Sequence, residues 1–134
     1  MATLAELDRS LPNGFHDAEV GSCVLDFVAR TATFELQIWI GDRDALLASE
    51  RELYRAARLV VTGLAFCQFE PPDPNYPFLE SRPLRVDLSD SDPSNRAIRA
   101  LPEGVFSGRF YVSNWNAFIQ LAGREAELLW MSDV

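Results

Sequence analysis

The sequence predicts a mainly β protein, a single-domain antiparallel β-sandwich or partly open barrel over residues 1–134. We expect about seven or eight strands and at most one or two short helices. Two observations lead to this fold class. Apolar and polar residues alternate in several short segments, which is the period of a half-buried strand. Turn-forming residues, mainly proline and glycine, separate these segments. The alternative is an α+β fold with a helix over residues 44–57.

The first two strands are expected to form a hairpin. Residues 1–14 form a tail or a short helical turn, which ends in the turn signal Leu11-Pro12-Asn13-Gly14. A strand follows over Glu19–Val28, and a second, clearer one over Thr33–Ile40. The short link Ala29–Ala32 favours direct pairing of the two. One face of the first strand would carry Cys23, Leu25 and Phe27.

The middle of the chain is ambiguous between helix and strand over residues 42–57. Asp42 or Asp44 can cap a helix, but the apolar spacing is irregular. We favour a loop with a helical turn, then a strand over Leu53–Thr62, which is rich in β-branched residues near its end. Gly63 then marks a bulge or a bend before a further strand over 64–69.

Five prolines in residues 70–83 rule out regular structure there, because each one fixes φ and removes an N–H donor. This segment is expected to be a long surface loop. A short strand over 84–88 follows, then a polar stretch over 89–102 with a helical turn opened by Ser94. Residues 105–113 alternate again and predict another strand.

The last residues predict a closing hairpin around Gly123-Arg124, since glycine at the first central position suits a type II′ turn. In that register one face is apolar throughout. The pairs on that face are Leu121 with Ala126, Ile119 with Leu128, and Ala117 with Trp130.

Composition excludes several kinds of chemistry. All twelve basic residues are arginine, so Schiff-base lysines and Walker-type phosphate loops are absent from the sequence. A single histidine, His16, excludes zinc or iron sites with several histidines in one chain. Cys23 and Cys67 have no CxxC spacing. We therefore expect no cofactor and no metal centre.

The net charge of −8 argues against a nucleic-acid partner, because an acidic protein repels phosphate backbones. No apolar run is long enough for a membrane helix. Residues 1–12 show no signal-peptide pattern, so we expect a cytoplasmic protein whose thiols are reduced.

His16, Asp17 and Glu19 are the most suggestive polar residues, since a histidine beside carboxylates can bind a ligand or titrate near neutrality. Neighbours on a strand point to opposite faces, which would keep His16 and Asp17 apart. We favour a structural His16 that hydrogen-bonds backbone at the sheet edge, with binding and catalysis as alternatives.

Trp39, Trp115 and Asn116 are the other candidates for binding. Trp39 lies on the face of its strand that otherwise carries polar residues. It therefore either anchors a partner or packs under the 70–83 loop. That loop carries two aromatic residues among its prolines and is itself a potential recognition surface.

Two segments carry a resemblance to known proteins. Residues 11–20, with the run Phe15-His16-Asp17-Ala18-Glu19-Val20, are similar to the opening of small bacterial β-domain proteins of uncharacterised function. Residues 110–130 resemble their closing hairpin. Some similar families are immunity proteins for polymorphic toxins, and the resemblance implies a small cytoplasmic β protein with no transferred catalytic residue.

The leading hypothesis is therefore a non-enzymatic binding domain, in one version an immunity-like inhibitor of a protein toxin, with a basic partner. An alternative is a small-ligand-binding protein or an enzyme with its site near His16. A third alternative is a homodimer formed through an exposed strand edge.

Overall fold

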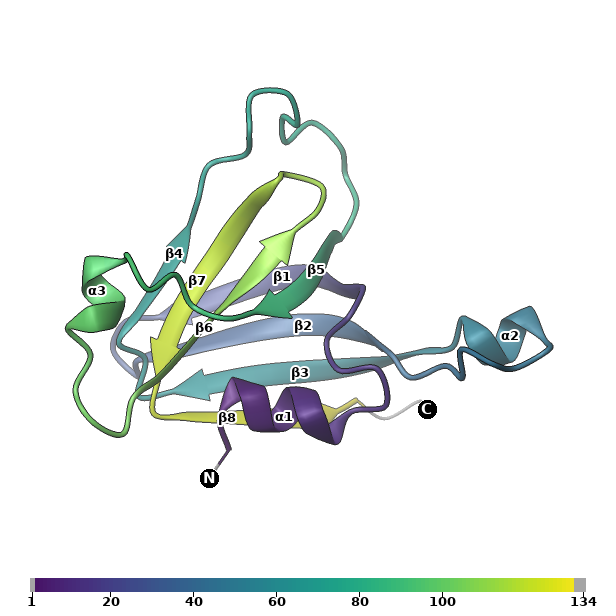
Figure 1. The fold of residues 1–134 in the computed structure, drawn as a ribbon, viewed down its shortest axis with the longest axis horizontal. Coiled ribbons are helices and arrows are strands. Elements are labelled where there is room, and N and C mark those ends of the chain that lie inside the picture. Colours follow the sequence, from purple (N-terminus) through teal and green to yellow (C-terminus); the bar gives the residue numbers. More distant parts are fainter. Residues whose placement is uncertain (1, 132–134) are drawn as a thin grey trace.

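The computed structural model describes residues 2–131; residues 1 and 132–134 of the predicted domain lie outside the described part. The predicted mainly β fold is confirmed, because eight antiparallel strands form one open sheet in the order β4-β7-β6-β5-β1-β2-β3-β8 (Figure 1). The strands are β1 (Ala18–Asp26), β2 (Thr31–Trp39), β3 (Tyr54–Thr62), β4 (Phe66–Phe69), β5 (Leu84–Ser89), β6 (Phe106–Val112), β7 (Ala117–Gly123) and β8 (Glu125–Trp130). The helices are α1 (Leu4–Ser10), α2 (Ala48–Arg51) and α3 (Arg96–Arg99).

The sheet folds over itself, and the core lies between its two halves. Figure 1 shows β6 and β7 running steeply across β1, β2 and β3. The ring of Phe34 in β2 lies 6.1 Å from that of Phe110 in β6, although these strands are not neighbours in the sheet. The ring of Phe15, which precedes β1, meets Phe110 edge to face at 5.6 Å. Leu4 brings α1 into the same core and packs against Gly108 of β6.

The predicted β1–β2 hairpin is confirmed, with one correction to its inward face. A bulge between Val20 and Ser22 shifts the register, so inward positions change from even to odd numbers along β1. Phe27, predicted to share a strand face with Cys23 and Leu25, lies beyond the end of β1 and is 83% exposed. The strand ends at Asp26, whose carboxylate accepts the N–H groups of Val28 and Ala29 and so forms the turn.

The predicted closing hairpin is wrong, although both of its segments are strands. β7 pairs with β6 and β4, whereas β8 pairs with β3. The chain crosses β3 at Gly123, where an added β-carbon would lie 2.5 Å from Cγ1 of Val61. The N–H of Arg124 then donates to the carbonyl of Thr62 at 3.0 Å, which starts the new pairing.

The ambiguous residues 42–57 contain the four-residue helix α2 followed by β3, as the loop-then-strand interpretation predicted.

The helical turn in the 89–102 segment is also present, but its N-cap is Asn95 rather than Ser94. The Asn95 side chain accepts from the N–H groups of Ala97 and Ile98. Residues 70–83 contain no helix or strand, as predicted. None of the helices in residues 2–131 is long and apolar enough to cross a membrane.

The conformation of the projecting segment between β2 and β3 requires a glycine at position 41. A β-carbon at Gly41 would overlap the carbonyl oxygen of Arg51, which also accepts the indole N–H of Trp39 at 2.5 Å. Gly41→Ala is therefore expected to lower the free energy of unfolding by about 1–3 kcal/mol, since the backbone of Arg51 must move. Chemical denaturation measures this effect.

The matched control for Gly41→Ala is Gly21→Ala, because the nearest atom to a β-carbon at Gly21 is the Glu35 carbonyl oxygen at 3.9 Å. The control should stay within about 0.5 kcal/mol of the wild type. Equal stability of the two variants would contradict the packing described for Gly41.

Candidate functional site

His16 lies in the turn between α1 and β1 and meets carboxylates from two elements. Its Nδ1 contacts Oδ1 of Asp87 in β5, and its Nε2 lies 3.5 Å from Oδ2 of Asp17. The expectation that His16 and Asp17 diverge is therefore wrong. Asp17 precedes β1 and has a φ of 54°, so the strand alternation does not apply to it. His16 bonds a side-chain carboxylate rather than the backbone predicted for it.

The pairing of β1 with β5 brings these residues together. Ala18 is opposite Val86, so the residue before Ala18 lies beside the residue after Val86. Oδ1 of Asp87 also accepts the N–H of Asp17 at 3.2 Å, and the hydroxyl of Tyr54 donates to the carbonyl of Asp17 at 3.1 Å. One further element, β3, thereby supports the cluster of His16, Asp17 and Asp87, which we call the His16 cluster.

Tyr54 keeps its proton in this environment. Burial raises the pKa of Tyr54, and the carboxylates of Asp17, Glu19 and Glu52 act in the same direction, while Arg85 opposes them. A protonated hydroxyl is what its hydrogen bond to Asp17 requires. Tyr54 therefore serves as a positioning group for the turn at Asp17.

The other two predicted residues near this cluster have structural partners. Glu19 lies 3.9 Å from Arg85, on the face that β1 shares with β5. Trp39 lies 5.9 Å from the His16 ring and donates to the carbonyl of Arg51, and the guanidinium of Arg43 stacks over it. Trp39 therefore supports the segment between β2 and β3. The prediction that it packs under the 70–83 loop is wrong.

The His16 cluster has the donor set for a divalent cation. One imidazole nitrogen and one oxygen from each of Asp17 and Asp87 lie within 4.8 Å of one another. Imidazole and carboxylate together suit transition-metal ions such as Zn²⁺ or Mn²⁺. All three residues are accessible to solvent to some degree, which leaves room for water ligands.

Trp115 and Asn116 belong to a second group, the anchor of the 70–83 loop. They lie in the turn between β6 and β7, where Asn116 has a φ of 49°. The carbonyl of Trp115 accepts the N–H of Asp73 at 2.9 Å, and the side-chain amide of Asn116 donates to Oδ2 of Asp73 at 3.0 Å. Phe78 meets the Trp115 ring edge to face at 5.3 Å. The residue under this loop is thus Trp115.

Glu70 fixes the start of the same loop. Its carboxylate accepts the N–H of Phe118 at 2.8 Å and the side-chain amide of Gln120 at 3.1 Å. Its own N–H donates to the carbonyl of Phe118 at 3.0 Å. The loop is therefore hydrogen-bonded to β7 through Glu70 and to the β6–β7 turn through Asp73. Both residues precede the exposed tip of the loop in the chain.

Asp73 provides a pH test of this anchor. The N–H of Asn75 and the side-chain amide of Asn116 hold the pKa of Asp73 below its ordinary value. A carboxylate with a lowered folded pKa stabilises the fold above its ordinary pKa of about 3.9, and this contribution is lost as the pH falls through the lowered value. Asn116→Gly is expected to raise the pKa of Asp73, since glycine keeps the positive φ but removes the amide.

Carboxyl NMR titration measures that change and contains its own control. The pKa of Asp92 is also lowered, by the hydroxyl and N–H of Ser94 and by Arg109, and these groups are untouched in Asn116→Gly. An unchanged Asp73 titration in the variant, with Asp92 also unchanged, would show that Asn116 does not hold the loop.

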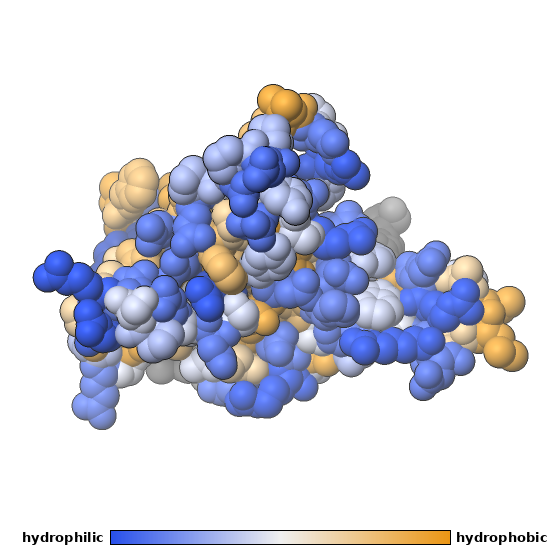
Figure 2. Space-filling model, turned by 45° about the horizontal axis from the view of Figure 1, so that its top comes forward, coloured by the Kyte–Doolittle hydropathy of each residue, from blue (hydrophilic) through white to orange (hydrophobic). Residues whose placement is uncertain are grey.

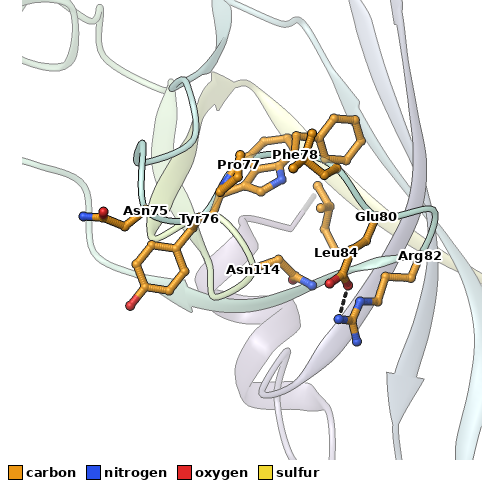
Figure 3. Close-up of a pocket in the computed structure, with 10 residues that line it drawn as sticks. Asn75, Tyr76, Pro77, Phe78, Glu80, Arg82, Leu84 and Asn114 are labelled. Atoms are coloured by element: carbon orange, nitrogen blue, oxygen red, sulfur yellow. Dashed lines mark ion pairs between the residues drawn. The ribbon is translucent and has the colours of Figure 1, made fainter.

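A cavity of about 470 Å³ lies between this loop and the bulge in β1. A smaller one of about 320 Å³ adjoins it, and the two share Phe78, Arg82, Leu84 and Trp115. Figure 3 shows the smaller cavity, with Leu84 pointing towards Phe78, Tyr76 at the opposite end of the lining from Arg82, and the ion pair of Glu80 with Arg82.

Sequence reasoning missed Asp87, Glu70 and Asp73. Each acts on residues distant in the chain, and nothing local distinguishes these acids from the other carboxylates. Asp87 follows the alternation of β5, but its neighbour across the sheet is known only once β1 and β5 are paired. The doubled prolines after Glu70 were the one signal near the loop anchor.

Comparisons with known proteins add no functional information. No protein-family model matches the chain, and no curated protein matches it. Among solved structures, the chain is similar to the crystal structure of an uncharacterized protein from Neisseria gonorrhoeae. The sequence identity is 7% and the TM-score 0.41, and the match covers 84% of this chain and 90% of that one.

Proposed function

We propose that this protein is a non-enzymatic binding domain that engages a protein partner through the tip of the 70–83 loop. The observation that carries the proposal is an anchored loop with an apolar tip. Asp73 and Glu70 tie its first residues to the sheet by hydrogen bonds. Beyond them, Phe78 is 62% and Leu79 83% exposed.

Anchoring matters because the loop then loses little further conformational freedom when a partner binds to it. Preorganised loops lose less conformational entropy on association, which leaves more of the contact energy as affinity. Aromatic and aliphatic anchors that enter a pocket on the partner carry most of the binding energy in many interfaces. Figure 2 shows hydrophobic residues at the protruding top of the molecule, where Figure 1 places this loop.

The negative net charge of the chain favours a basic protein as the partner. A chain with a net charge of −8 attracts a basic partner and accelerates its association at low salt. In the version suggested by the resemblance of residues 11–20 and 110–130, the partner is a protein toxin in the cytoplasm and this domain inhibits it.

Capture from a native bacterial lysate tests the proposal. Tagged wild-type protein should retain one basic partner in a one-to-one complex that weakens at high salt. Light scattering of the isolated protein should give a monomer, whereas a stable dimer would favour pairing through an edge strand such as β8. A captured protein that the loop variant described in the Discussion retains equally would contradict the proposed surface.

A second candidate function, divalent-metal binding, is favoured by the three ligand groups of the His16 cluster. Zn²⁺ or Mn²⁺ is expected to raise the unfolding temperature by mass action, with a stabilisation of about 2.7 kcal/mol at a hundred times the dissociation constant. His16→Ala and Asp87→Asn should abolish the rise, which differential scanning calorimetry measures.

Asp90→Asn is the matched control for Asp87→Asn, because the carboxylate of Asp90 is outside the cluster. It should keep the full metal-induced rise. No rise in the wild type with either ion, or an equal rise in all variants, would remove this second candidate.

A further inference from the structure

Cys23 and Cys67 are distant in the sequence, but the fold brings their side chains to one place. Cys23 is opposite Phe34 in the pairing of β1 with β2, and Cys67 is opposite Leu121 in the pairing of β4 with β7. Directly opposed residues of antiparallel strands share a face of the sheet. Because Phe34 and Leu121 are fully buried, both thiols point into the core between the two halves of the folded sheet.

The strand β4 lies beside β1 where neither strand has another partner. Near the start of β4, the N–H of Leu64 donates to the carbonyl of Arg30 in the β1–β2 turn at 2.9 Å. At the other end, Phe69 of β4 and Val20 of β1 line the same cavity. Within residues 2–131, β4 pairs only with β7, and β1 beyond Val20 pairs only with β2. An unpaired gap, the β1–β4 seam, therefore remains between the two strands, and the two thiols face each other across it.

The two thiols are in hydrogen-bond contact, and this contact makes them unequal. The hydrogen bond from Cys67 lowers the pKa of Cys23, while burial acts in the opposite direction. The same hydrogen bond and burial both raise the pKa of Cys67. Cys23 also lines the cavity beside the seam, so a small molecule can reach its sulfur. Since the thiolate is the nucleophile in thiol–disulfide exchange, Cys23 is the thiol that reacts first.

We propose that Cys23 and Cys67 form a redox-sensitive dithiol, which a small-molecule disulfide converts into an intramolecular disulfide across the β1–β4 seam. The sulfur atoms must approach to about 2 Å, and the short edge strand β4 has an unpaired side towards β1 that permits this movement. Because β4 leads directly into the 70–83 loop, the disulfide would connect the base of that loop to β1. The proposal does not depend on the protein partner of the loop tip.

The exchange takes place in two balanced steps. The Cys23 thiolate attacks one sulfur of the small disulfide, whose S–S bond breaks, and the leaving thiolate takes up the proton that Cys23 has lost. The sulfur of Cys67 then loses its proton and attacks the Cys23 sulfur of the mixed disulfide, and the second leaving thiolate takes up that proton. The two protein thiols are thereby oxidised, and the small disulfide is reduced to two thiols.

Reaction of the full-length protein with hydroxyethyl disulfide, a small neutral disulfide, tests the proposal. Intact-mass spectrometry of the native wild type should show the loss of two hydrogen atoms and no retained adduct. Peptide mapping should find the link between residues 23 and 67 within one chain. Excess dithiothreitol should restore both thiols.

Two variants test the order of the steps and the position of the thiols. Cys67→Ala removes the second thiol, so the reaction should stop at a mixed disulfide on Cys23. The matched control combines Cys23→Ser with Val24→Cys, which keeps two thiols but moves one to the outward face of β1, where Val24 is 62% exposed. This control should retain an adduct at position 24 and form no internal link.

Three results would overturn the proposal. The first is a native wild type that reacts at neither cysteine, retains adducts on both, or forms links only between chains. The second is a Cys67→Ala variant that retains no adduct on Cys23. The third is an internal disulfide that forms as readily in the control with the moved thiol as in the wild type.

Discussion

Replacing Leu79 by Ser is expected to reduce the affinity for the protein partner by at least about thirtyfold, the effect of losing one hot-spot side chain of about 2 kcal/mol. Leu79 is 83% exposed, the highest value among the large apolar side chains of the 70–83 loop. The variant therefore removes an anchor without disturbing the fold. Isothermal titration of the purified partner with wild type and variant measures the change.

Leu46→Ser is the matched control, because Leu46 is 95% exposed on the other projecting segment, between β2 and β3. Its affinity should equal that of the wild type. If Leu46→Ser weakens binding and Leu79→Ser does not, the partner binds the β2–β3 segment and the proposed surface is wrong.

Replacing Phe110 by Ala is expected to lower the free energy of unfolding by about 3–5 kcal/mol, which is a large part of the stability of a small domain. Phe110 is 1% exposed and contacts the rings of Phe15 and Phe34, so it joins the two halves of the folded sheet. Its removal leaves a cavity where those halves meet. Guanidinium denaturation measures the loss.

Phe27→Ala is the control for that prediction, since Phe27 lies in the exposed turn between β1 and β2. Its effect should stay within about 0.5 kcal/mol of the wild type. Comparable losses in the two variants would contradict a core centred on Phe110.

The alternation of apolar and polar residues predicts the strands well, because burial of one face of a strand requires an apolar side chain at every second position. Phe34, Leu36 and Ile38 alternate in sequence and are buried in the structure. The same pattern does not identify a strand's partner. The apolar face of residues 125–130 is compatible with a hairpin to β7, but in the structure these residues pair with β3, where Gly123 passes close to Val61.

The candidate sites are predictable only in part, because the sequence pattern does not show which strands are neighbours in the sheet. The sequence identifies His16 and Asp17 as candidate binding residues, but strand alternation does not apply to the turn in which Asp17 has a positive φ. Asp87 joins them through the β1–β5 pairing, which bridges a long sequence separation. The loop of residues 70–83 was evident from its prolines, whereas its anchors at Glu70 and Asp73 depend on β7 and the turn before it.

Amide hydrogen exchange of the domain with and without its captured partner shows which segment the partner covers. Binding through the loop tip is expected to slow exchange at the N–H groups of Asn75, Tyr76, Phe78, Leu79 and Glu80. Slowed exchange confined to the β2–β3 segment or to the β8 edge, with residues 75–80 unchanged, would contradict it.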